Sequence, residues 1–517
     1  MLSKKAAKKA RKKASEAASA AAVAEGEADE ELQLLELGAK ANAADARRAH
    51  IESVWVVESR DLDGEAEMRR RFGASSVRAA QREAAQEARR GHQQLEVRGG
   101  RGGRRPAPRR VLLVTPKADW GRSHGLYSMG VRPHPTSEGL QLFQFDYSAE
   151  ALALNSQFEQ LVLASADPQM LMELLRAQPC HVGALLQLHA VATQTGQAEL
   201  SAEFLLRALW AHEASVHPTF AAAWLRGDAK LFHAHPPNRP FFRALHLHAV
   251  ALARRGCHKA AVAVATLLLS LERTDPTHVF LWLDLFALKA GAPHLLVRFT
   301  AAEPDACIRL PGWMLSRALA LRLLAESPPP PEMREELLAA ATVDVAPSAA
   351  GSGDGGGGGG GSKKRPPPVP WEGGGPDSAL RAALLTFPAM LSAALSACNP
   401  SESSGAMQLA ARWEAAFPSA ANAALEHLTV LYWERCTELW ARPERLVWLV
   451  SVASGLLDKV EAARAAAAGA AGSAKKAAGT ALLQEVAACS ACTERWYPAG
   501  GGDPLRGCEL EINAENL

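Results

Sequence analysis

PFFRALHLHAVALARRGCHKAAVAVATLLLSLERTDP, residues 240–276, holds two apolar stripes at helical spacing, separated by a glycine and closed by Asp-Pro. Pro240 suits the first turn of a helix, because the N–H that proline lacks would have no partner there. Apolar residues recur on one side until Gly256 and resume until Asp275-Pro276, which is the pattern of two amphipathic helices joined by a glycine turn. The stripes are Phe241, Leu245, Ala249 and Leu252, then Ala261, Val264, Ala265, Leu268 and Leu271.

The order of helix, glycine, helix and proline stop recurs on the N-terminal side of this stretch. Gly196 precedes a segment with Leu200, Phe204 and Ala208 in register, which ends near Pro218. Such punctuation is typical of tetratricopeptide-like repeats, although the spacing here is irregular and the full consensus is missing. We therefore predict an all-α fold, a degenerate tetratricopeptide-like helical-repeat solenoid with a concave face for partners.

Changes in composition divide the chain into six expected segments. They are a disordered basic and acidic arm at 1–50, an extended and partly helical segment with an Arg-Gly stretch at 51–147, helical repeats at 148–345, a disordered Gly/Pro-rich linker at 346–377, further helical repeats at 378–460, and a low-complexity C-terminal segment at 461–517. Within the second segment, residues 54–57 have the composition of a short strand, and 65–90 form a charged helical stretch that could not fold alone. Residues 140–145 alternate weakly and are expected to run extended over the surface.

The composition excludes several classes of protein. No apolar run approaches the ~20 residues that a membrane-spanning helix needs, and the start of the chain lacks the apolar core of a secretory signal. Eight cysteines in 517 residues form no disulfide framework, so we expect reduced thiols and a location in the cytosol, with the nucleus as an alternative.

Motifs of catalysis and metal binding give no positive indication. The sequence contains no phosphate-binding loop, serine-hydrolase elbow, zinc-protease or kinase signature, and an enzyme ranks last among the hypotheses. Cys489 and Cys492 have the spacing of half a zinc site but lack a convincing second half, so two reduced thiols are the better interpretation. His246 and His248 point apart on a helix and cannot share a metal. We expect no catalytic residue, cofactor, metal site or small-molecule substrate.

Positive charge gathers near the N-terminus. Residues 1–110 hold 24 Lys+Arg against 17 Asp+Glu, a net charge of +7, so the remainder carries −5 of the total of +2. Residues 98–110 read RGGRGGRRPAPRR, a flexible polycation whose guanidinium groups suit phosphate and unpaired bases. The candidate nucleic-acid-binding residues are Lys4, Lys5, Lys8, Lys9, Arg11, Lys12, Lys13, Arg98, Arg101, Arg104, Arg105, Arg109 and Arg110. A solvated linker, or a nuclear-import signal at the lysine run, is the alternative interpretation.

Several strings occur in the order of one known family. They are Val54-Trp55-Val56-Val57-Glu58-x-Arg60-x-Leu62, Glu67-Met68-Arg69-Arg70-Arg71-Phe72-Gly73-Ala74, Thr115-Pro116-Lys117-x-x-Trp120, Gln178-Pro179-x-His181-Val182, Asn238-Arg239-Pro240-Phe241-Phe242 and Arg255-Gly256-Cys257. On these strings the chain resembles the transcription factor 25 family, also described as subunit 1 of the ribosome quality control complex. Its family-motif residues are Arg69, Arg70, Phe72, Gly73, Pro116, Lys117 and Trp120.

The resemblance implies a non-enzymatic subunit that acts on large ribosomal subunits holding a stalled nascent chain. Partners implied in this way are rRNA, the Listerin E3 ligase, ubiquitin and the AAA ATPase segregase, with lysine-48-linked ubiquitin chains and no membrane. Relative to the family, 348–376 looks like an insertion, while an acidic N-terminal extension and much of the C-terminal tail are missing. We therefore expect a fragment, a short form or an incorrect gene prediction.

The alternative function is a nuclear DNA-binding transcriptional repressor that uses the same basic run. The family's older description as a basic helix-loop-helix factor fits the residues less well. No amphipathic zipper of sufficient length follows residues 4–13, and 65–90 is too polar to supply one.

Overall fold

The computed structural model describes residues 53–79, 82, 112–117, 120, 125–135, 139–164, 168–331, 333, 334, 337, 375–398, 404–418, 422–468 and 473–498. Contacts divide the chain into the units 1–53 and 54–517, and all described residues except Ser53 belong to the second. Its first elements are η1 (Ser53–Trp55), η2 (Ser59–Leu62), α2 (Gly64–Phe72), β1 (Tyr127–Pro133) and β2 (Gln141–Tyr147).

Helices make up nearly all of the remaining described chain, which confirms the predicted all-α repeat fold. The middle of the chain holds α4 (Ala149–Ala164), α5 (Pro168–Ala177), α6 (Val182–Gln194), α7 (Ala198–Glu213), α8 (Phe220–Leu225), β3 (Ala229–Leu231), η4 (Pro236–Asn238), α9 (Arg239–Arg254) and α10 (His258–Leu271). After it come α11 (Phe280–Lys289), α12 (Pro293–Ala302), α13 (Pro304–Arg309), α14 (Pro311–Glu326), α16 (Pro376–Thr386), α17 (Ala389–Ala397), α18 (Ser404–Ala416), α19 (Ala423–Trp440), α20 (Pro443–Ala468) and α21 (Ser473–Trp496).

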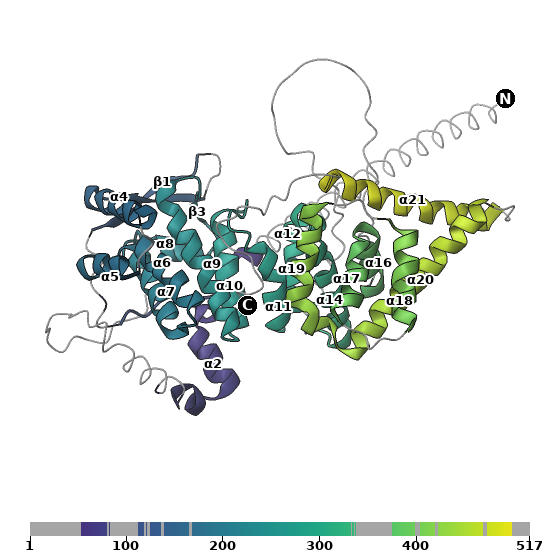
Figure 1. Ribbon diagram of the computed structural model, residues 1–517, viewed down its shortest axis with the longest axis horizontal. Coiled ribbons are helices and arrows are strands. Elements are labelled where there is room, and N and C mark those ends of the chain that lie inside the picture. Colours follow the sequence, from purple (N-terminus) through teal and green to yellow (C-terminus); the bar gives the residue numbers. More distant parts are fainter. Residues whose placement is uncertain are drawn as a thin grey trace, which may run out of the picture. The chain divides into compact units, whose positions relative to one another are not determined.

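Glycine turns join the helices into pairs, as the sequence predicts. Gly196 between α6 and α7 has φ +71°, and Gly256 between α9 and α10 has φ +78°, a conformation that costs glycine little. In both turns the next residue donates its N–H to the carbonyl five residues back, from Gln197 at 2.8 Å and from Cys257 at 2.9 Å. This is the Schellman closure of a helix, and it folds each pair back on itself so that its members lie side by side (Figure 1).

Helix α10 is buried all round, which differs from the single apolar stripe that the sequence pattern predicts. Every residue from Ala260 to Leu271 is buried. Helices α9 and α11 cover it, as repeats should, but α2, η2, α8 and β3 also pack against it. The N-terminal elements therefore occupy a face that an isolated repeat would leave to solvent.

A three-stranded sheet was not predicted and lies beside α8 and α9. Strand β1 pairs antiparallel with β2, and β2 pairs parallel with β3. The weak alternation at 140–145 does form an extended strand, but Phe143 and Phe145 are fully buried, not spread over the surface. Phe145 packs edge-on against Phe241 of α9, with ring centroids 5.3 Å apart.

One local prediction needs correction. The strand expected at 54–57 is instead the 3-10 helix η1 followed by irregular chain, because the Val57 N–H donates to the Leu225 carbonyl at 3.0 Å and not to a strand.

Helix α11 does not follow Asp275-Pro276 directly but begins at Phe280. The Asp275 carboxylate accepts the N–H groups of Val279 (2.9 Å) and Phe280 (2.8 Å), so it caps the helix across the intervening turn.

Among the described helices, none alone combines the length and composition needed to cross a membrane, while the bent pair α16 and α17 meets that criterion only when taken together.

Candidate functional site

The segment from Trp55 to Phe72 is fastened to the repeat helices by specific contacts. The Trp55 side chain is buried, and its ring meets Phe299 of α12 edge-on with centroids 5.6 Å apart. The Arg273 guanidinium lies over the same ring, 4.8 Å from its centroid. A buried aromatic ring with a cation over it holds this segment against the array through both apolar burial and cation–π attraction.

Glu67 supplies the N-terminal cap that α10 lacks. Its carboxylate accepts the backbone N–H of Lys259 at 3.0 Å and that of Ala260 at 2.9 Å, while the local cap residue Cys257 contributes no side-chain bond. Arg71, one turn further along α2, donates to the Gly256 carbonyl. A carboxylate at a helix N-terminus is favoured by the helix dipole, so α2 is fixed to the turn between α9 and α10 at two points.

A second N-terminal segment is held by α7 in the same way. The Glu213 carboxylate accepts the N–H groups of Leu113 at 2.7 Å and Val114 at 3.1 Å. Nearer the start of α7, the Glu203 carboxylate accepts hydrogen bonds from both the Lys117 ammonium and the Trp120 indole N–H. The structure thus brings the predicted motif residues Lys117 and Trp120 together on one carboxylate.

These contacts separate the predicted motif residues into two groups. Lys117 and Trp120 are engaged in holding the chain to α7, and Gly73 closes α2 with φ +84°. Arg69, Arg70 and Phe72 are exposed instead. The carboxylates of Glu67 and Glu213 were not predicted, because nothing in the local sequence marks an acid that bonds to backbone about a hundred or more residues away.

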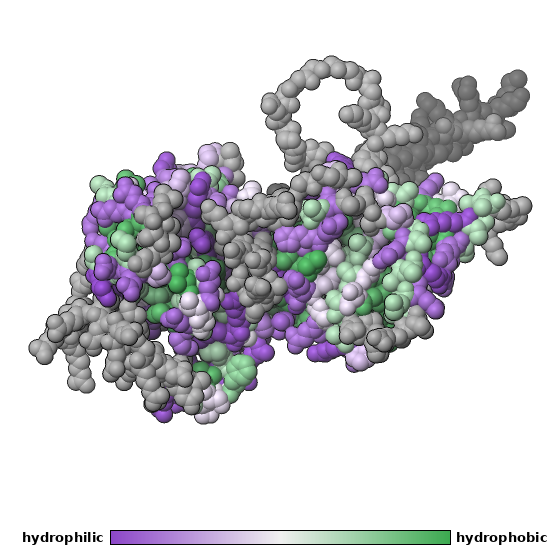
Figure 2. Space-filling view, viewed as in Figure 1, coloured by the Kyte–Doolittle hydropathy of each residue, from purple (hydrophilic) through white to green (hydrophobic). Residues whose placement is uncertain are grey.

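Exposed cations lie on α2, just after it, and at the α9–α10 turn, which α2 contacts through Glu67 and Arg71. We call these exposed residues together the α2 surface: Arg69, Arg70, Arg71 and Phe72 of α2, Arg78 shortly after it, and Arg254, Arg255 and Lys259 at the turn. The Arg71 guanidinium lies over the Phe72 ring at 5.6 Å, and that ring is 55% exposed. Figure 2 shows hydrophilic and apolar residues next to each other over α2, at the lower edge of this view.

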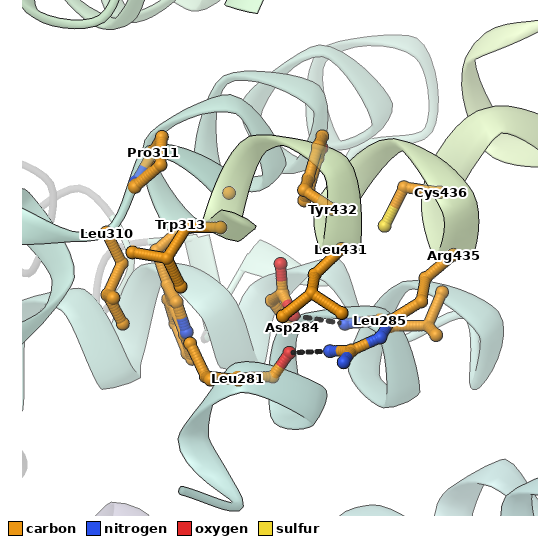
Figure 3. Close-up of a pocket in the computed structure, with 12 residues that line it drawn as sticks. Leu281, Asp284, Leu285, Leu310, Pro311, Trp313, Leu431, Tyr432, Arg435 and Cys436 are labelled. Atoms are coloured by element: carbon orange, nitrogen blue, oxygen red, sulfur yellow. Dashed lines mark hydrogen bonds between the residues drawn. The ribbon is translucent and has the colours of Figure 1, made fainter. Parts of the chain in front are cut away.

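The cavity of Figure 3 lies between α11, α14 and α19. It has a volume of about 30 Å³, which holds a water molecule but is far below the ~300 Å³ of a typical small-molecule pocket. Arg435 of α19 and Asp284 of α11 face it (Figure 3). Arg435 donates to the Leu281 carbonyl at 3.1 Å and stacks over Trp282 at 3.9 Å, while its Nε and Nη2 atoms have no partner among the described protein atoms.

Asp284 belongs to a buried chain of polar groups beside this cavity. Ser316 Oγ donates to its Oδ2 at 2.7 Å and lies 3.2 Å from the Tyr432 hydroxyl, which accepts the Trp440 indole N–H at 2.9 Å. Burial raises the pKa of Asp284 to about 6, against the opposing effect of the Ser316 hydrogen bond. Asp284 lies in α11, Ser316 in α14, and Tyr432 and Trp440 in α19, so these hydrogen bonds join the three helices and have the character of a structural contact.

The histidines and cysteines singled out in the sequence are placed as follows. His246 and His248 are both buried in α9. Cys489 and Cys492 lie one turn apart in α21 as free thiols. Across the described ranges, no group of three or more histidine, cysteine or acidic side chains is arranged to hold a metal. The thirteen basic residues of 4–13 and 98–110 lie outside the described residues.

Comparison with known proteins settles the family. A family model described as "Transcriptional repressor TCF25" matches residues 143–487, well over half of the chain. The chain belongs to this family. The matched region of the Tcf25 family contains both α7 carboxylates and the α9–α10 turn, and the resemblance inferred from the sequence is confirmed.

Curated relatives of this Tcf25-family chain carry two kinds of name. The human protein "Ribosome quality control complex subunit TCF25" is 30% identical over 276 residues, which cover 53% of this chain and 38% of the relative. "Probable transcription factor claV" of Ampulloclitocybe clavipes is 32% identical over 287 residues, covering 50% and 35%. "Ribosome quality control complex subunit 1" of Schizosaccharomyces pombe is 29% identical over 219 residues, covering 41% and 32%.

The chain therefore spans less than half the length of these relatives. No solved structure matches it.

Proposed function

We propose that this Tcf25-family chain is a non-enzymatic subunit of the ribosome quality control complex, a scaffold that binds large ribosomal subunits with stalled nascent chains. The observation that carries the proposal is a helical-repeat array whose matched family includes relatives named as subunits of that complex. Stacked helix pairs offer extended surfaces to macromolecules, which suits a scaffold. We expect the chain to act in the cytosol.

Contact with rRNA is assigned to the basic segments. The six arginines of 98–110 and the lysine-rich run of 4–13 form two strongly basic sequences whose side chains suit phosphate. The repeat surface is assigned to the Listerin ligase and ubiquitin, where the subunit favours lysine-48-linked chains and assists recruitment of the AAA ATPase segregase.

Sedimentation of 60S subunits at rising salt tests this proposal. Replacing the six arginines of 98–110 with serine should lower the salt concentration at which the chain leaves the 60S fraction. A chain with serine at exposed Arg176, Arg442 and Lys459 controls for a general loss of charge. Unchanged 60S association of the arm variant would show that the arm has no such role.

The ligase assignment has a separate test. A tagged chain recovered from cells with stalled translation should bring down Listerin and ubiquitinated nascent chains. Recovery of 60S subunits without the ligase would contradict the assignment of the repeat surface while leaving ribosome binding intact.

A nuclear DNA-binding repressor is the second candidate function. It is supported by the description of the family as a transcriptional repressor and by the name of the fungal relative. It requires sequence-selective binding of duplex DNA by residues 1–110. A competition assay in which unrelated duplexes compete equally would dismiss it.

A further inference from the structure

We propose that the α2 surface is a binding site for single-stranded RNA, with arginines on the phosphates and the Phe72 ring as a platform for an unpaired base. The proposal deepens the proposed function, on which it rests, because it names a second contact to rRNA that is separate from the basic arm. It stands on eight exposed side chains of α2, of the residues just after it and of the α9–α10 turn, and on the contacts that hold α2 against this turn.

The two parts of the surface are held in register by buried contacts. Glu67 binds the N–H groups of Lys259 and Ala260, and Cys257 Sγ lies 3.3 Å from the Gly64 carbonyl. Arg71 donates to the Gly256 carbonyl. The fold therefore holds α2 and its arginines against the turn that carries Arg254, Arg255 and Lys259.

Few carboxylates of the described chain pair with the cations of this surface. Among the described residues, Glu65 is the one carboxylate paired with an arginine of the α2 surface, at 2.7 Å from Arg69. Glu67 is buried, and its carboxylate accepts hydrogen bonds from the N-terminus of α10. Burial lowers the pKa of neighbouring His258, and the charges of Lys289 and Arg71 lower it further, against the opposing charges of Glu67 and Glu438.

The side-chain types favour RNA over an acidic protein. Arginine outnumbers lysine six to one, and the planar guanidinium matches phosphate with two hydrogen bonds. Phe72 leaves more than half of its surface to solvent in the midst of these cations, with Arg71 over its ring. An exposed aromatic ring among arginines is how proteins hold unpaired bases, whereas a duplex offers no free base face.

The test uses the full-length chain with the arm arginines of 98–110 replaced by serine, so that the folded surface is seen alone. Binding of a fluorescein-labelled 12-nucleotide oligouridylate is followed by anisotropy at several salt concentrations. Arg69, Arg70 and Arg78 are then changed to serine, leaving Arg71 in place because it holds the turn. Three lost phosphate contacts should reduce the slope of log affinity against log salt by roughly 2.

Phe72 gives a second and independent measurement. Phe72→Ala should weaken oligouridylate binding by about 5- to 100-fold, while Phe72→Tyr keeps the affinity within about twofold because stacking is preserved. Serine at Arg176, Arg442 and Lys459 is the matched charge control and should leave the slope nearly unchanged. Circular dichroism of each variant confirms that the helices remain folded.

Each outcome decides one of the two claims. Equal affinity of the α2 variants and the control, or displacement of the RNA by an acidic peptide but not by unlabelled RNA, would overturn the α2 surface as an RNA site. Equal binding of single-stranded and duplex RNA would overturn the role of Phe72. If the α2 surface binds the oligonucleotide but the full chain never sediments with 60S subunits, the proposed function fails and the RNA site stands.

Discussion

At the residue scale, three glutamates explain why the N-terminal segments are ordered on the array. Glu67, Glu203 and Glu213 each accept two hydrogen bonds from groups far away in the sequence. Bonds to an ionised acceptor are about twice as strong as neutral ones, so each carboxylate acts as a point of attachment.

Removing the Glu67 carboxylate should destabilise the chain. Glu67→Ala leaves the N–H groups of Lys259 and Ala260 without their acceptor, which should cost about 2 kcal/mol of unfolding free energy. Urea denaturation followed by tryptophan fluorescence measures this, with the exposed Glu65→Ala as control at under ~0.5 kcal/mol. Equal midpoints for the two variants would contradict the capping role.

Asp284 should make stability fall as the pH rises. Its pKa is raised to about 6 in the folded chain, so the folded state holds the proton more tightly than the unfolded state does. This contribution is present below about pH 4 and is lost as the pH rises towards 6. Between pH 4 and pH 7 the native chain should lose roughly 2–3 kcal/mol relative to Asp284→Asn, measured by urea unfolding at each pH. A constant difference between the two would refute the assignment.

His212 should act in the opposite direction. Burial lowers its pKa to about 4, from the ordinary 6.5, among the rings of Tyr127, Phe145 and Phe241. Its contribution to stability is complete above pH 6.5 and is lost as the pH falls towards 4. His212→Gln should therefore lose less stability on acidification than the native chain, by up to about 1.4 kcal/mol per pH unit. Parallel pH profiles would contradict this.

At the element scale, the N-terminal segment completes the burial of α10. Ala260–Leu271 is buried on every side because α2 and η2 of the N-terminal segment, together with α8 and β3, pack against it in addition to α9 and α11. A helix that is hydrophobic all round must be buried all round. The segment is thus part of the folded array and not an appendage.

Loss of the Trp55 ring should release this segment. Trp55→Ala removes a buried ring that contacts Phe299 and Arg273, at a cost of about 3–5 kcal/mol. Trypsin should then cleave within 60–71 much faster than in the native chain, since the backbone on either side of these exposed arginines is no longer held against the repeat helices. The neighbouring Val56→Ala is the control, because Val56 is 51% exposed. Equal cleavage rates of the two variants would exclude the anchoring role.

The elements that were predicted correctly are those whose pattern is local. Gly196 and Gly256 could be predicted as turns because a turn with positive φ depends on the residue at that position, and glycine adopts it readily. The flanking helices follow from the spacing of apolar residues within each helix. Strand β1 was missed because Gly130 and Pro133 interrupt it, and its pairing with β2 is a long-range property. Residues 54–57 have strand composition, but a 3-10 helix and contact with Leu225 prevail over that propensity.

At the scale of the whole molecule, the sequence was sufficient for the family and the repeat fold but not for the site. Arg69, Arg70 and Phe72 were recognised as motif residues without a stated role. Their grouping with Arg254 and Arg255 depends on contacts across roughly 190 residues, made through Glu67 and Cys257. No spacing rule within the sequence encodes such a juxtaposition.

The proposed function is that of a scaffold that binds ribosomal RNA while its helices bind protein partners. Purified full-length chain, mixed with 60S subunits that carry a stalled nascent chain and sedimented at increasing salt, tests it most directly. We expect the chain to co-sediment with 60S subunits at low salt. When the arginines of 98–110 are replaced by serine, it should dissociate at a lower salt concentration than the native chain. A chain that stays at the top of the gradient even at low salt would contradict it.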